Sequence, residues 1–224
     1  MIMQHIGLMF AMDKEMAFFA SMLENLQQKT IHQRTFYTGV VGNKVITAVV
    51  SGTGKVNAAI CTADLISVFK ADMILNIGIS GGLDSSLSIG DFVVGKDIVY
   101  HDVWCGNPYK YGQVQGLPEM YHSAPALVAK LEKYRQGLLC CGDYFVEKAE
   151  TLQAIKNKFP AALAVDMESG AIAQTCYLYD IPLLSVRQIS DVPGSENHAE
   201  QYATFWENAP ANTINLLREI LKVI

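Results

Sequence analysis

Short apolar runs alternate along the chain with longer segments in which apolar residues recur at helical spacing. The apolar runs predict strands at residues 6–10, 36–41, 44–50, 73–79, 91–100, 137–141, 162–165 and 182–189. The longer segments predict helices at residues 13–26, 55–69, 124–134, 148–158, 167–178 and 200–223, the last one bent near Pro210. Gly42-Asn43 indicates a hairpin, so we expect a mixed sheet within an α/β layered fold.

Residues 103–120 interrupt this alternation with several glycines and prolines, and they predict one long loop. Long loops inside compact domains are often functional. The chain has no internal repeat and no low-complexity linker. We therefore expect one domain over residues 1–224, with ligands at the carboxyl ends of its strands.

Composition narrows the function classes. Half of the 224 residues are apolar, which is enough for a sizeable core, and the net charge is −5. The chain has no dense basic stripe of the kind that binds nucleic acid, and no apolar run reaches the ~18 residues of a membrane span. Because Met12 is followed by the charged residues Asp13, Lys14 and Glu15, with no basic stretch before it, the N-terminus does not resemble a signal peptide.

The five cysteines have no regular spacing, and neither Cys-x-x-Cys nor His-Glu-x-x-His occurs. This pattern argues against a disulfide framework and against a zinc site. Reduced thiols in a cytoplasmic protein fit it best. We expect no metal.

Two glycine-rich motifs match known patterns only in part. Gly52-Thr53-Gly54-Lys55 lacks the flanking residues of a phosphate loop, because Val49 and Val56 stand where glycine and serine or threonine are needed. Gly78-Ile79-Ser80-Gly81-Gly82 matches a nucleophile elbow, but no helix follows it. A hydrolase triad with His101, His122 or His198 stays open. We interpret both motifs as tight turns whose backbone can approach a ligand closely.

Three carboxylates follow predicted strands, namely Glu15, Glu168 and Asp191. Such residues, distant in sequence, can converge on one crevice, where they can position a water, hold sugar hydroxyls and donate a proton. The alternative is that each is a charge at the start of a helix, where the helix dipole favours it.

A series of short motifs then identifies a family. They are Ala11-Met12-Asp13-x-Glu15, Ser51-Gly52-x-Gly54-Lys55-Val56, Asn76-x-Gly78-x-x-Gly81-Gly82-Leu83, Gly142-Asp143-x-Phe145, Val165-Asp166-Met167-Glu168 and Ser190-Asp191. In this order they resemble the 5′-methylthioadenosine/S-adenosylhomocysteine nucleosidases of the purine nucleoside phosphorylase superfamily. The resemblance implies a three-layer α/β/α domain around a mixed, partly barrel-like sheet, usually a homodimer. It also implies hydrolysis of the bond between adenine and a 5′-substituted ribose, with water and no cofactor.

The resemblance also implies roles for individual residues. Glu15 matches the residue that deprotonates the water, Asp191 the acid that protonates purine N7, and Arg187 an arginine that helps to hold the water and a carboxylate. Glu168 matches the carboxylate on the ribose hydroxyls, and Phe145 the ring stacked on adenine. The other expected substrate-binding residues are Met167, Val146, Ile79, Ser80, Gly81, Met12, Thr53 and Ser190.

Some positions depart from the family pattern. Ile79 replaces a serine near the water, and Thr53 stands where an aliphatic residue usually lines the 5′ pocket. The run at 103–108 also differs. The natural substrate therefore stays open among methylthioadenosine, adenosylhomocysteine, 5′-deoxyadenosine and aminodeoxyfutalosine.

Two alternative functions are a phosphorylase of the same superfamily and a nucleoside-binding protein without turnover. A phosphate site needs arginine and serine donors. Asn76 and Ile79 occupy those positions, which opposes phosphorolysis. For assembly, we expect a homodimer in which loop 103–120 approaches the partner's site; the alternative is a loop that folds onto its own subunit.

Overall fold

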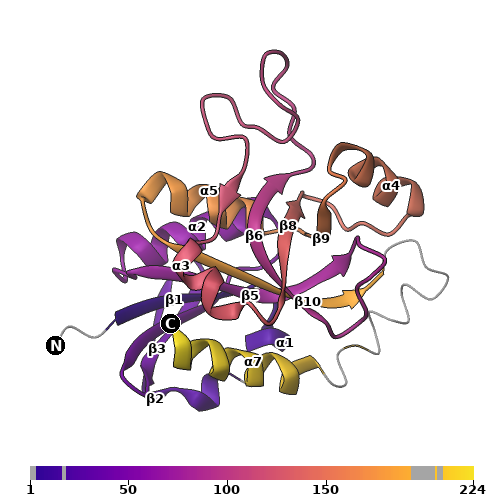
Figure 1. Ribbon diagram of the computed structural model, residues 1–224. Helices are drawn as coiled ribbons and strands as arrows, with labels where there is room; N and C mark the ends of the chain where they lie inside the picture. Colours follow the sequence, from indigo (N-terminus) through magenta and orange to yellow (C-terminus); the bar gives the residue numbers. More distant parts are fainter. Residues whose placement is uncertain (1–3, 17–18, 193–204, 206–208) are drawn as a thin grey trace.

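The computed structural model describes residues 4–16, 19–192, 205 and 209–224, without the side chains of Lys14, Glu15, Ala209, Pro210 and Ala211. Figure 1 shows a mixed sheet flanked by helices. The strands are β1 Gln4–Phe10, β2 Glu24–Ile31, β3 Arg34–Val41, β4 Lys44–Val50, β5 Met73–Gly82, β6 Phe92–Tyr100, β7 Tyr121–His122, β8 Arg135–Cys141, β9 Ala162–Asp166 and β10 Leu183–Asp191. The α-helices are α1 Asp13–Met16, α2 Lys55–Ser67, α3 Pro125–Val128, α4 Ala149–Lys158, α5 Ser169–Tyr179 and α7 Ala209–Val223, with 3₁₀ turns η1 Ala20–Met22 and η2 Ala129–Leu131.

The sheet closes on itself at one end. Its strand order is β10-β6-β8-β9-β5-β1-β4-β3-β2, and β10 also pairs with β5. The strands β5, β9, β8, β6 and β10 therefore form a closed ring, and the remaining strands extend from β5 as an open sheet. β10 and β5 run parallel, whereas β10 and β6 run antiparallel. The expected mixed, partly barrel-like sheet is confirmed.

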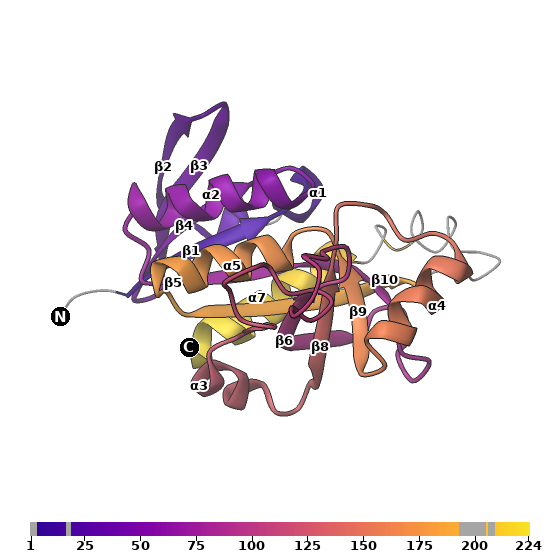
Figure 2. The same ribbon diagram turned by 90° about the horizontal axis from the view of Figure 1, so that it is seen from above.

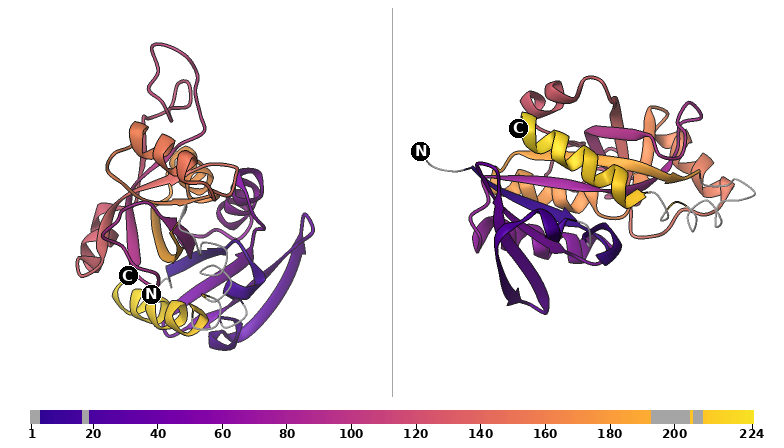
Figure 3. Two further views of the ribbon diagram at one scale, coloured as in Figure 1. Left: turned by 90° about the vertical axis from the view of Figure 1, so that its right-hand side faces the viewer. Right: turned by 90° about the horizontal axis from the view of Figure 1, so that it is seen from below.

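Helices cover both faces of the sheet. α2 and α5 lie on one face and α7 lies on the other, as Figures 1 and 2 show, and the view from below in Figure 3 has α7 in front. Met9 of β1 and Ile74 of β5 pack in the cluster that holds α2 and α5, whereas Leu8 and Leu75 pack in the cluster that holds α7. Because successive residues face different helical layers, both strands need apolar residues at nearly every position.

The predicted helix at 13–26 is wrong in its second half. α1 ends at Met16, η1 follows, and Glu24–Ile31 is strand β2, which pairs antiparallel with β3. β2 is an exposed, polar edge strand, so it lacks the apolar alternation by which a half-buried strand is recognised. Its pairing with β3 determines its conformation.

Some predicted elements differ in length from those in the structure. β5 continues through Gly81 and Gly82, because these residues pair with Val165 and Ala164 of β9. The predicted helix at 124–134 is limited to α3 and η2. Most of residues 200–208 lie outside the described residues, so the expected bend near Pro210 is untested.

The chain between β6 and β7 forms the predicted long loop, which projects from the body of the molecule (Figure 1). Trp104 and Tyr111 stack within it, with ring centroids 5.9 Å apart. None of the helices in the described ranges is long and apolar enough to cross a membrane.

Candidate active site

A cavity with about 750 Å³ of empty space, part of it open to solvent, lies where several strands end. Its walls are formed by the segments that follow β1, β4, β8 and β9 and by residues of β5 and β10. Its lining combines apolar side chains with a few polar groups, which is typical of sites that hold a small molecule. The carboxyl-terminal residues Gly81 of β5 and Val165 of β9 pair at its edge, so the barrel brings strand ends together that are far apart in sequence.

The cavity collects nearly all of the predicted site residues. The lining includes Met12, Thr53, Ile79, Ser80, Gly81, Phe145, Val146, Met167, Glu168, Arg187, Ser190 and Asp191. Glu15 belongs to helix α1, which begins directly after the lining residues Ala11 and Met12. The side chain of Glu15 lies outside the described part of the structure. The lining also includes residues to which the sequence assigned no role, among them Asn76, Tyr144 and Asp166.

A buried ion pair between Arg187 and Asp166 lines the cavity. The Arg187 guanidinium donates from Nε to Oδ2 of Asp166 at 2.6 Å, and from Nη2 to Oδ1 of Asn76 at 2.5 Å. Both charged side chains are 2% exposed, so each compensates the other's charge in a site with little solvent. Asp166 and Asn76 stand within the family motifs, but only the structure shows that both hold the Arg187 guanidinium.

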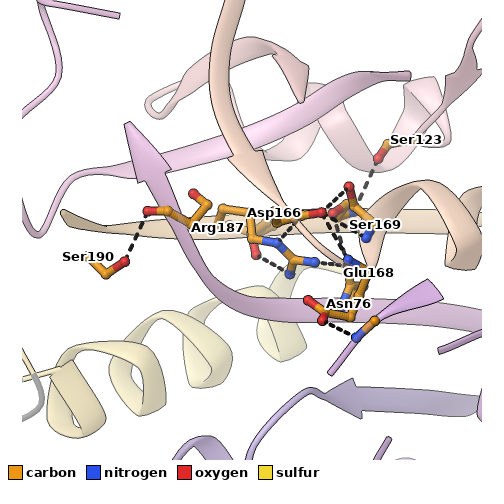
Figure 4. Close-up of polar contacts among 11 residues, drawn as sticks. Asn76, Ser123, Asp166, Glu168, Ser169, Arg187 and Ser190 are labelled. Carbon is orange, nitrogen blue, oxygen red and sulfur yellow. Dashed lines mark hydrogen bonds and ion pairs between the residues drawn. The ribbon is translucent and has the colours of Figure 1, made fainter. Parts of the chain in front are cut away.

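Asp166 also organises the start of α5. Its Oδ1 accepts hydrogen bonds from the backbone N–H of Glu168, from the backbone N–H of Ser169 and from the Ser169 hydroxyl. Figure 4 shows these contacts together with the Arg187 pair. One carboxylate thereby fixes both the arginine and the backbone of the next acidic residue.

Glu168 is buried and is held from a second direction. The backbone N–H of Gly54 donates to its Oε1 at 2.8 Å. Gly52 and Gly54 have φ angles of 81° and 97°, which glycine adopts readily and other residues do not. The glycine-rich turn after β4 therefore approaches a carboxylate, which agrees with its interpretation as a tight turn and not as a phosphate loop.

Asp191 is buried next to a hydroxyl. Ser190 Oγ lies 2.5 Å from Asp191 Oδ1 and 3.2 Å from the backbone oxygen of Ser80. The Ser190 hydroxyl can donate to the Asp191 carboxyl group or to the Ser80 carbonyl, and its contact with Asp191 holds that carboxyl group at the cavity wall.

The segment after β8 supplies an aromatic wall. Tyr144 and Phe145 are partly exposed, with 43% and 48% of their surfaces accessible, whereas Val146 is buried. An accessible ring at the mouth of a cavity suits stacking against a flat ligand.

The expected tight turn at Gly78–Gly82 is wrong, because these residues continue strand β5. The alternative of a nucleophile elbow is excluded for the same reason, since Ser80 lies inside the strand, and its hydroxyl has no hydrogen-bond partner among the described residues. His101 contacts Tyr144, and His122 contacts Asp97. His198 lies outside the described residues. In the same described ranges, no group of three or more His, Cys, Asp or Glu side chains is placed to hold a metal ion.

Comparison with known proteins agrees with this fold and site. The model of the phosphorylase superfamily matches residues 5–222. The chain is 38% identical over 217 residues to the 5′-methylthioadenosine/S-adenosylhomocysteine nucleosidase of Staphylococcus aureus (strain MRSA252), which covers 93% of this chain and 95% of that protein.

Two solved structures are also similar to this chain in fold and sequence. The S-adenosylhomocysteine nucleosidase of Streptococcus pyogenes, in complex with 5-methylthiotubericidin, superposes with a TM-score of 0.94 at 34% identity, covering 99% of this chain and 97% of that one. The nucleosidase of Neisseria meningitidis, in complex with methylthio-immucillin-A, has a TM-score of 0.93 at 33% identity, covering 99% and 100%. The chain belongs to the 5′-methylthioadenosine/S-adenosylhomocysteine nucleosidase family within the phosphorylase superfamily.

Proposed function

We propose that the protein hydrolyses the N-glycosidic bond of 5′-substituted adenosines and releases adenine and the 5′-substituted ribose. The observation that carries this proposal is that one cavity brings Asp191, with its serine partner, together with Glu168 and Phe145. The related nucleosidase of Colwellia psychrerythraea, 32% identical, was solved in complex with adenine, which supports the same class of product.

Asp191 is the proposed acid for the leaving group. Adenine leaves poorly as an anion, and protonation at N7 removes this barrier. Asp191 supports this role by its position, because it lines the cavity, is buried, and is held by a hydrogen bond from the Ser190 hydroxyl.

The remaining contacts bind the nucleoside. Phe145 stacks on adenine and the Val146 backbone contacts the edge of the base. Glu168 accepts hydrogen bonds from the ribose hydroxyls, with Met167 packed beside the sugar. Gly54 supports this assignment, because its N–H holds the Glu168 carboxylate at the cavity wall.

The proposed nucleophile is a water that Glu15 deprotonates with the help of Arg187. The cavity lacks an arginine at position 76, and Asn76 is already bonded to Arg187, which disfavours a phosphate site there. Glu15→Gln should lower turnover on the order of 10²–10⁴-fold while the protein still binds the nucleoside.

The test is adenine release with and without phosphate, with analysis of the sugar product. We expect free 5′-substituted ribose and a rate that is independent of phosphate. A sugar 1-phosphate as the main product would instead identify a phosphorylase, and nucleoside binding without product would identify a binding protein. Turnover of methylthioadenosine, adenosylhomocysteine, 5′-deoxyadenosine and aminodeoxyfutalosine then ranks the 5′ groups.

We further propose a cytoplasmic homodimer in which loop 103–120 approaches the partner's cavity. Five free thiols support a reducing compartment. Trp104 in the loop is 54% exposed, and α2 leaves Val56 and Ile60 exposed one helical turn apart. Apolar and aromatic side chains of this kind are enriched at interfaces.

A further inference from the structure

We propose that Lys55 is a positioning residue that joins three loops around the nucleoside site, through Asp102 and Asp143. This inference rests on the proposed function, because the loops in question carry the groups assigned to the base and the ribose. None of the three residues lines the cavity itself.

The Lys55 side chain joins the loop after β4 to the loop after β6. Lys55 is the first residue of α2, next to the turn that ends in Gly54. Its ammonium group donates to both oxygens of Asp102, at 3.0 Å to Oδ1 and 2.8 Å to Oδ2. Asp102 follows β6, at the start of the long loop.

The backbone of the same residue joins the loop after β8. The Lys55 N–H donates to Oδ1 of Asp143 at 2.8 Å, and the Asp143 N–H donates to Oδ2 of Asp102 at 2.8 Å. The ammonium group lies 4.0 Å from Oδ2 of Asp143. Lys55, Asp102 and Asp143 therefore form a closed triangle of contacts, which we call the Lys55 clamp.

Each corner of the clamp is adjacent to a group of the site. Gly54, before Lys55, donates to Glu168, and Thr53 lines the cavity. Asp143 precedes Tyr144, Phe145 and Val146, which all line the cavity.

His101, before Asp102, packs edge-on against Tyr144, with ring centroids 5.0 Å apart. The clamp thereby fixes Glu168, the carboxylate proposed to bind the ribose hydroxyls, relative to the aromatic wall.

The geometry distinguishes the clamp from an ordinary surface ion pair, which contributes about 0–1 kcal/mol. The side chains of Lys55 and Asp102 are only 22% and 17% exposed, and the ammonium group also lies over the Tyr100 ring, 5.1 Å from its centroid. Without the cation, two carboxylates face each other across the loops, and their repulsion separates the aromatic wall from the turn at Gly54.

Lys55→Met tests the clamp. We expect the KM for the nucleoside and the Kd for adenine to rise together on the order of 10-fold, with kcat changed much less, because base placement is lost and the acid is untouched. Lys55→Arg should restore most of the affinity. Hydrogen exchange should quicken at the amides of 143–146.

Lys133→Met is the matched control. Lys133 pairs with Glu219 at 2.7 Å, and neither residue lines the cavity, so this variant loses an ion pair and should keep its KM and its adenine affinity. Asp102→Asn provides a second route to the same loops, and the double variant with Lys55→Met should be less impaired than the sum of the two single effects.

Unchanged KM and adenine affinity in folded Lys55→Met would overturn the clamp, as would a loss of kcat alone. If Lys55→Met fails to fold, Lys55→Arg and Asp102→Asn decide the question by the same two readouts. Adenine binding by calorimetry needs no turnover. A wild-type protein that binds adenine but releases none from any 5′-substituted adenosine therefore refutes the proposed function and leaves the clamp testable.

Discussion

Asp191 shows how a neighbouring hydroxyl can hold a side chain in place. The Ser190 hydroxyl lies within hydrogen-bond distance of both the Asp191 carboxyl and the Ser80 carbonyl, and it is the donor in either contact. Both Ser190 and Asp191 are buried and line the cavity, so the carboxyl group is fixed where the proposed reaction needs its acid.

The corresponding prediction is for Asp191→Asn. An amide has no acidic proton to give, so turnover should fall on the order of 10²–10⁴-fold while the fold and the nucleoside affinity persist. The loss should be smallest with a synthetic riboside whose leaving group departs without protonation. Steady-state kinetics on both substrates check this. If Asp191 were a helix cap instead, asparagine would serve equally well, and near-normal adenine release would refute the acid role.

The residues of the site were predictable to the extent that they stand in short motifs. Glu168, Phe145 and Asp191 were assigned from such motifs, and all three line the cavity. The role of Asp166 was not, because it depends on an ion pair with Arg187, 21 residues further along the chain. Tyr144 occupies a variable motif position, so the motif carried no signal for it.

Among the elements, predictability follows burial. Strands such as β1 and β4 face packed layers on both sides, and their mostly apolar runs identified them. β2 is held by one neighbour and faces solvent, so its sequence does not differ from that of a polar helix. Closure of the barrel depends on the pairing of β10 with β5, more than 100 residues apart, which local patterns do not specify.

The junction of β6 and β8 leads to a prediction about pH. His101, just after β6, is buried against Gly142, just after β8, where any Cβ would collide with its ring. Burial lowers the pKa of His101, although the charges of Asp102 and Asp166 partly oppose this and Lys55 adds to it. The folded protein therefore binds the His101 proton less tightly than the unfolded chain does.

The stabilising contribution of neutral His101 is therefore fully present above the unfolded histidine pKa of ~6.5. This contribution is lost as the pH falls from ~6.5 towards the lowered pKa of His101 in the folded protein. His101→Phe keeps an aromatic ring and removes the titration, so its free energy of unfolding should decline less between pH 7.5 and pH 5. Urea titrations of both proteins at the two pH values measure this. His5, whose pKa is also lowered by burial, should account for part of the remaining slope. Equal declines in the two proteins would contradict the assignment.

At the scale of the whole molecule, the cavity and the outer faces of two helices differ in character. The cavity gathers polar groups at strand ends, whereas α2 and α5 carry large apolar side chains outward, among them Val56, Ile60 and Leu178. Val56 and Ile60 are one turn apart on α2, so they share a face of the helix. The same helix begins at Lys55, and a partner that covered this face would lie close to the turn that holds Glu168.

The proposed homodimer makes this arrangement testable. Light scattering at micromolar concentration should give twice the chain mass of 24.6 kDa. Val56→Glu together with Ile60→Glu places two charges on the exposed apolar face and should shift the mass towards the monomer, because buried unpaired charges are costly. Lys130→Glu, on η2, changes the charge of the surface elsewhere and should leave the mass unchanged.

If loop 103–120 reaches the partner's cavity, Trp104→Ala should raise the KM without a change in mass. The monomeric double variant should show a similar rise in KM, because it has no partner loop. A wild-type protein of 24.6 kDa in solution would refute the dimer and would assign the loop to its own subunit.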